Sequence, residues 1–63
     1  MKNSNSYKEE RAEIIEKMEA IVNSTEGREL TSDESTTFDS LNEKVEELNK
    51  TISRAKSFEN LQA

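Results

Sequence analysis

Acidic side chains are the only groups in this sequence plentiful enough to suggest a reactive or metal-binding site. The chain contains neither histidine nor cysteine, so the usual general bases, thiol nucleophiles and zinc ligands are missing. Glu9, Glu10, Glu13 and Glu16 lie close together near the N-terminus. Such carboxylates can pair for acid–base catalysis or bind a hard cation. They lie outside the apolar stripe of their segment, however, and a solvated helix face explains them better.

A second chemical signal is the stretch from Asp33 to Asp39, which superficially resembles a calcium-binding loop. Phe38 stands where such a loop needs glycine for its sharp turn, so we reject this site. The hydroxyls of residues 31–35 are potential phosphorylation sites, but helix capping explains them with fewer assumptions. We therefore predict that the protein is not an enzyme and has no catalytic residue, cofactor, bound metal or small-molecule substrate.

Charge and composition restrict the partners. The net charge is −5, with 9 basic and 14 acidic residues. This balance argues against nucleic acid and against an anionic membrane surface, both of which attract basic proteins. Hydrophobic residues make up 30% of the 63 residues, which leaves a very small core. Small domains of this kind are stabilised by disulfides, metals or partner chains, and without Cys or His we expect a homo-oligomer.

The spacing of apolar residues predicts a first helix over residues 6–24. Ser6 is the expected N-cap, with Glu9 three residues later as in a capping box. The polar residues 1–5 are predicted to be a disordered leader. Arg11 interrupts the apolar stripe, and two interpretations remain open. Its stem can pack while its charge reaches solvent, or it can pair with Glu46 or Glu47 on a facing helix.

A turn is predicted over residues 25–31. Gly27 suits a left-handed conformation just beyond a helix end. Thr31 and Glu34 then form a second capping-box pattern at the start of the next helix. Leu30 precedes this cap and is expected to fold back onto the second helix. The signals agree on a short connection between two helices.

The second helix is predicted over residues 32–61, with apolar residues that alternate in steps of three and four. A short connection favours an antiparallel pair, so the predicted fold is all-α, a two-helix antiparallel coiled-coil hairpin. We expect the second helix to outrun the first by about ten residues at its C-terminal end, roughly 15 Å. The predicted seam consists of Tyr7, Ile14, Met18, Ile21, Leu30, Phe38, Leu41, Val45, Leu48, Ile52 and Ala55. The candidate self-association residues are Phe58, Leu61, Ile15 and Val22.

The connector and second helix resemble a known family. The run of residues 26–34, EGRELTSDE, is followed by Phe38-Asp39-Ser40-Leu41 and then by a regular seam. This pattern is similar to the N-terminal scaffolding (delta) domain of tailed-bacteriophage major capsid proteins. In that family an acidic helix precedes an E-G-R-x-L-T-x-x-E turn and a helix that opens on F-D-x-L. The likeness extends from Tyr7 to Ala63.

The resemblance implies a function in capsid assembly. Such domains project into the immature shell, the procapsid, in the cytoplasm of the bacterial host. There they cluster through helix packing and guide the capsid subunits, and a phage maturation protease later removes them. The implied partners are other copies of the chain, the capsid shell domain or other capsid subunits, and that protease. The alternative from the residues alone is a small cytosolic coiled-coil adaptor or regulator that binds a partner helix.

Overall fold

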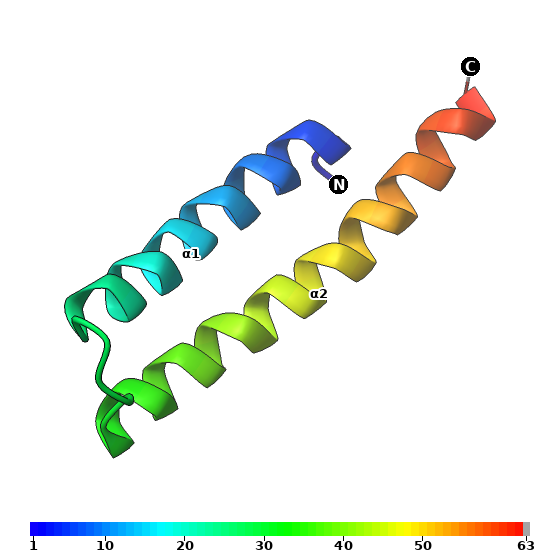
Figure 1. Cartoon of the computed structure of the whole chain (residues 1–63). Helices are drawn as coiled ribbons and strands as arrows, with labels where there is room; N and C mark the ends of the chain where they lie inside the picture. The colour runs from blue at the N-terminus through cyan, green and yellow to red at the C-terminus, as the bar shows by residue number, and fades with distance from the viewer. Residues whose placement is uncertain (63) are drawn as a thin grey trace.

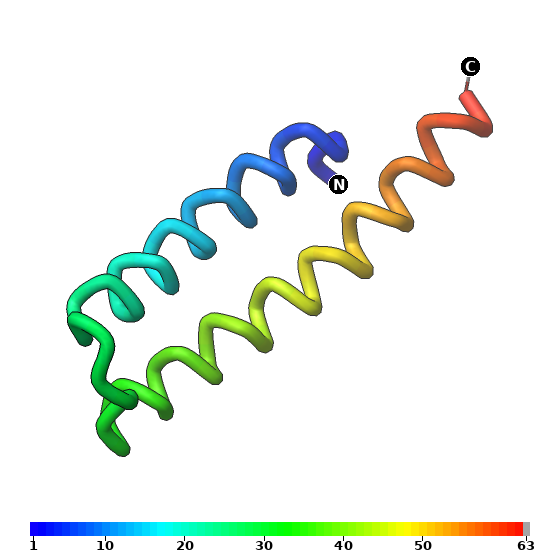
Figure 2. The backbone as a smooth tube through the Cα atoms, in the orientation of Figure 1, coloured from blue at the N-terminus to red at the C-terminus, as the bar shows by residue number. Residues whose placement is uncertain are grey.

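The computed structural model describes residues 1–62 and contains two helices, α1 (Ser4–Ser24) and α2 (Ser32–Gln62). The helices run in opposite directions and lie side by side, joined by a short connector (Figure 1, Figure 2). No strand occurs in residues 1–62, whose extents are 48 × 15 × 14 Å. The predicted all-α, two-helix antiparallel hairpin is therefore confirmed. Ala63, where the family resemblance ends, lies outside the described residues.

The first helix begins earlier than predicted. Asn3 has extended backbone angles (φ −75°, ψ 165°), and its side-chain oxygen accepts a hydrogen bond from the Ser6 amide at 2.9 Å. Asn3 is therefore the N-cap, and the prediction that Ser6 has this role is wrong. The predicted disordered leader over residues 1–5 is wrong for Ser4 and Asn5, which are helical. An asparagine caps a helix as well as a serine does, so Asn3 can begin the helix about one turn before Ser6.

The core of the hairpin is narrow. Ile52 and Ala55 are the buried hydrophobic residues, with 5% and 1% of their surface exposed. A pair of helices covers only one side of each helix, so most seam side chains keep an edge in solvent. The half-buried seam residues are Tyr7, Ile14, Met18, Ile21, Leu30, Phe38, Leu41, Val45 and Leu48.

The register of the two helices makes the overhang of α2 at the chain termini shorter than predicted. The amide and hydroxyl of Ser4 donate to the two carboxylate oxygens of Glu59, at 2.9 and 2.8 Å. The start of α1 thus reaches a side chain in the last turn of α2, so the predicted ten-residue overhang at that end is too long. Figure 1 shows that α2 extends past α1 at both ends, beyond the start of α1 at the chain termini and beyond the end of α1 at the turn. The sequence estimate assumed that both helices start level at the turn, whereas the connector itself runs along the beginning of α2.

Candidate interaction surfaces

The acidic residues near the N-terminus are not gathered into a metal-binding group within residues 1–62. Glu9, Glu13 and Glu16 are exposed along α1, and Glu10 forms an ion pair with Lys2 at 2.7 Å. Within residues 1–62 no group of three or more potential metal-binding side chains comes together. The stretch from residue 33 to 39 lies inside α2, so its backbone is helical and cannot wrap a cation as a calcium loop does.

The turn is built around a reciprocal capping pair. The Thr31 amide donates to Glu34 Oε1 at 2.9 Å, and the Glu34 amide donates to Thr31 Oγ1 at 3.2 Å. These two bonds satisfy backbone donors that the first turn of α2 leaves without partners. The turn residues that the sequence singled out, Thr31 and Glu34, therefore lie together at the start of α2.

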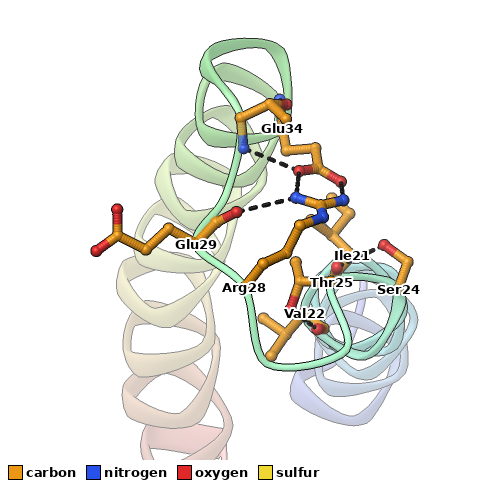
Figure 3. A network of polar contacts seen from close by, with 8 residues as sticks. Ile21, Val22, Ser24, Thr25, Arg28, Glu29 and Glu34 are labelled. Carbon is orange, nitrogen blue, oxygen red and sulfur yellow. Dashed lines mark hydrogen bonds and ion pairs between the residues drawn. The ribbon is translucent and has the colours of Figure 1, made fainter.

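Arg28 joins this capping pair from the connector. Figure 3 shows its guanidinium facing the Glu34 carboxylate, with two hydrogen bonds of 2.7 and 3.1 Å. Arg28 also donates to the carbonyl of Glu29 at 2.9 Å. The hydrogen bond from Arg28, followed by that from the Thr31 backbone, lowers the pKa of Glu34 from 4.5 to about 2. The sequence motif did not reveal this role of Arg28, which needs the connector to fold back over the start of α2.

The end of α1 uses two left-handed residues. Thr25 is buried, and its hydroxyl donates to the Val22 carbonyl at 2.7 Å (Figure 3). Glu26 has φ of 52° and Gly27 has φ of 91°. Glycine adopts such angles without steric cost, whereas glutamate does so only against a penalty. The predicted left-handed Gly27 thus follows a left-handed Glu26, which no sequence signal indicated.

Arg11 crosses the hairpin to an uncharged partner. Its Nη1 donates to Asn49 Oδ1 at 2.7 Å, and the side chain is half-buried. The ion pair with Glu46 or Glu47 that the sequence left open is absent among the hydrogen bonds and ion pairs of residues 1–62. Asn49 directly follows the seam residue Leu48. This place next to the seam was the sequence feature that could have indicated its contact with Arg11.

The four candidate self-association residues fall on different surfaces. Ile15 and Val22, exposed by 39% and 50%, line one groove between the helices. Phe58, exposed by 49%, lies with residues 1–3 beside a smaller hollow near the chain termini. Leu61 is 84% exposed and lines neither cavity. The structure therefore does not gather these residues into one apolar tip.

The positions of the exposed residues relative to the seam explain why they fall on different surfaces of the hairpin. Ile15, Val22 and Asn42 each directly follow a seam residue, and all three line the same groove. Residues that directly precede a seam position of helix α2, such as Lys44 and Thr51, line a separate groove. In an antiparallel pair the two flanks of the seam lie on opposite sides of the hairpin. We call the side with Ile15 and Val22 the apolar flank.

Within residues 1–62, the candidate interaction surfaces are the grooves on the two flanks of the hairpin and the hollow near the chain termini. Neither helix within residues 1–62 combines the length and apolar character needed to cross a membrane. Comparisons with protein families, curated proteins and solved structures found no match to this chain.

Proposed function

We propose that the chain is an assembly-scaffolding segment that acts by helical self-association inside an immature phage head. In this proposal it extends a capsid shell domain, clusters with other copies while subunits assemble, and is later removed by a maturation protease. The location would be the procapsid interior in the bacterial cytoplasm. The proposal unites the family resemblance of the turn with the incomplete burial of the hairpin.

The observation that carries the proposal is the small buried core. Burial of a large apolar side chain contributes roughly 1.5–3 kcal/mol, and ordering the backbone costs roughly 1–2 kcal/mol per residue. Ile52 and Ala55 are buried, while Ile15 and Val22 keep 39% and 50% of their surface exposed. A second chain that covers such side chains adds the stability that one hairpin lacks.

The turn gives a second line of support for the same function, separate from the small core. Gly27, Thr31 and Glu34 belong to the sequence run that resembles the scaffolding family, and they lie together in a bonded turn. Such a turn holds two helices in a constant register, which repeated contacts between many copies require. The negative charge is also suitable for a segment that must not bind DNA before the head is filled.

Molar mass in solution tests the self-association. We expect sedimentation equilibrium over a concentration series to show reversible association with a micromolar or weaker Kd, because each interface is small. Weak contacts suit a scaffold that is later dismantled. A monomer that persists across the whole series would contradict the proposal and favour the adaptor function, in which a helix of another protein is the partner.

The capsid context has a separate test. The gene is expected to continue beyond the codon for Ala63 into a shell-forming domain. A stop codon directly after Ala63 would contradict a role as part of a capsid protein, even if the hairpin self-associates.

A further inference from the structure

The apolar flank contains a groove that extends between the two helices near the turn. Its lining combines Ile15, Met18 and Val22 of α1 with Phe38 and Val45 of α2. The cavity has a volume of about 380 Å³, room for several apolar side chains. Asn42 and Glu19 contribute polar atoms at the same groove.

Charge is distributed unevenly along the hairpin. Residues 12–48, the half that contains the turn and the groove, carry 11 acidic and three basic side chains. Residues 1–11 and 49–63, the half that contains the chain termini, carry six basic and three acidic side chains. Two copies that lie parallel would place like charges together, whereas two antiparallel copies place each acidic half against a basic half.

Two of the six basic side chains of the basic half lie on the apolar flank. Lys8 and Lys56 each directly follow a seam residue, as Ile15 and Val22 do. The two ammonium groups lie close to one another, and mainly the charge of Lys56 lowers the pKa of Lys8. The same flank therefore carries an apolar groove in its acidic half and a pair of like positive charges in its basic half.

We infer that a second copy of this chain covers the groove, antiparallel to the first and related to it by a two-fold axis near Asn42. In this arrangement the two grooves face each other, as the self-complementary interface of a two-fold dimer requires. Lys56 lies 14 residues beyond Asn42, about 21 Å along the helix. Because the second copy runs in the opposite direction, its turn, which carries Glu26 and Glu29, lies at the same level as Lys56 of the first copy. The positive pair of each copy thus meets an acidic turn.

This inference rests on the proposed self-association and adds its surface and its direction. The occupant is a second copy because the two halves of the chain carry opposite net charge, so that a reversed copy places each acidic half against a basic half. A helix of another protein would fill the groove without needing this two-fold pattern.

Substitution inside and outside the groove tests the surface. We expect Ile15→Ser/Val22→Ser to weaken association at least about tenfold, since two apolar side chains leave the interface. Phe58→Ser removes an exposed apolar residue that lies outside the groove, beside the hollow near the chain termini, and should change the Kd by less than about twofold. Serine has a helix propensity close to those of isoleucine, valine and phenylalanine, and circular dichroism checks that each hairpin remains helical.

A second variant keeps the test independent of the apolar residues. Asn42→Glu places two carboxylates beside the two-fold axis, and it should weaken association at low salt. Ser53→Glu adds the same charge at an exposed position outside the groove and should have little effect. Wild-type association that all these variants retain would overturn the groove assignment but leave the self-association intact. Absence of wild-type association would overturn both proposals.

A spin label tests the direction. Asn60 is exposed and lies 18 residues beyond Asn42, about 27 Å along α2. With a label at Asn60→Cys, the antiparallel pair predicts a label-to-label distance near twice that value, about 54 Å. A parallel pair would give a distance on the order of 20 Å, since packed helices lie 8–10 Å apart. The short distance would overturn the antiparallel arrangement.

Discussion

At the scale of single residues, the turn contains the clearest relation between side-chain chemistry and conformation. Gly27 has a left-handed backbone, and a Cβ atom placed there would meet no atom within 4 Å. Any cost of adding a side chain at this position therefore comes from the backbone angle alone. The neighbouring Glu26 already accepts a similar angle, so two consecutive residues share this conformation.

We expect Gly27→Ala to lower the free energy of unfolding by roughly 1–2 kcal/mol, because an L-residue resists positive φ. Thermal or urea unfolding followed by circular dichroism measures this loss. The chain is short enough for chemical synthesis, and D-alanine at position 27 is the matched control. D-alanine prefers positive φ and should keep or raise the stability. Equal losses for both alanine forms would point to a steric cause instead.

Glu34 makes the turn sensitive to acid. Its pKa is about 2 in the folded chain and 4.5 ordinarily, because its charged form accepts hydrogen bonds from Arg28 and Thr31. A lowered pKa stabilises the fold fully above about pH 4.5, and this contribution disappears as the pH falls towards 2.

Comparison of the wild type with Glu34→Gln isolates this contribution from the other carboxylates. We expect the wild type to have the higher Tm between pH 5 and 7, and the difference in Tm to vanish as the pH approaches 2. Melting curves at a series of pH values provide the measurement. A difference that stays constant down to pH 2 would show that the charge of Glu34 does not stabilise the turn.

At the scale of the elements, the burial of a side chain depends more on its position along the seam than on its residue type. Ile52 and Ala55 are buried, while Leu41 and Leu48 of the same stripe are half-buried. The deepest part of the interface lies towards the chain termini. There, Ser4 and Glu59 join the ends of the two helices at 2.8 and 2.9 Å.

Alanine substitutions along α2 test this gradient. Ile52→Ala should cost about 2–4 kcal/mol, as deletion of buried methyl groups does, or unfold the hairpin outright. Leu41→Ala should cost less because its side chain already contacts solvent, and Glu43→Ala on the exposed face should cost less than about 0.5 kcal/mol. Urea unfolding gives the three values. Equal losses at Ile52 and Glu43 would mean that the helices do not pack along this stripe.

At the scale of the whole molecule, the hairpin is a narrow rod with opposite charge in its two halves. It is 48 Å long and about 15 Å wide. Its ends differ, because the turn carries exposed glutamates and the termini end carries Lys8, Arg54 and Lys56. Such a rod has one favourable side-by-side orientation with its own copy, which is the basis of the inferred antiparallel pair.

The hairpin itself is tested by spin labels at Glu9→Cys and Ser53→Cys, two exposed positions on different helices. Both lie near the same level of the rod, so we expect a distance comparable with its 15 Å width plus the label arms. One continuous helix would separate these positions by about 66 Å. Dilution with unlabelled chain ensures that the measured distance lies within one molecule.

The sequence alone determined the helices, the turn and the capping pair, because these depend on neighbours within about four residues. The spacing of Ile14, Met18 and Ile21 already defines an apolar face, and Thr31 and Glu34 interact across a single helical turn. No distant part of the chain is needed for either. For the same reason Gly27 could be placed at the end of a helix before its backbone angle was known.

Only the tertiary structure decided the register, the start of α1 and the division of the exposed apolar residues. Ser4 meets Glu59 across 55 positions, and Arg11 meets Asn49 across 38. Such pairings depend on how the connector runs along α2, which shifts the whole of α1 relative to its partner. Ile15 and Phe58 were likewise grouped by their apolar character alone. Their separate surfaces follow from the way in which the two helices pack against each other, which no local pattern in the sequence specifies.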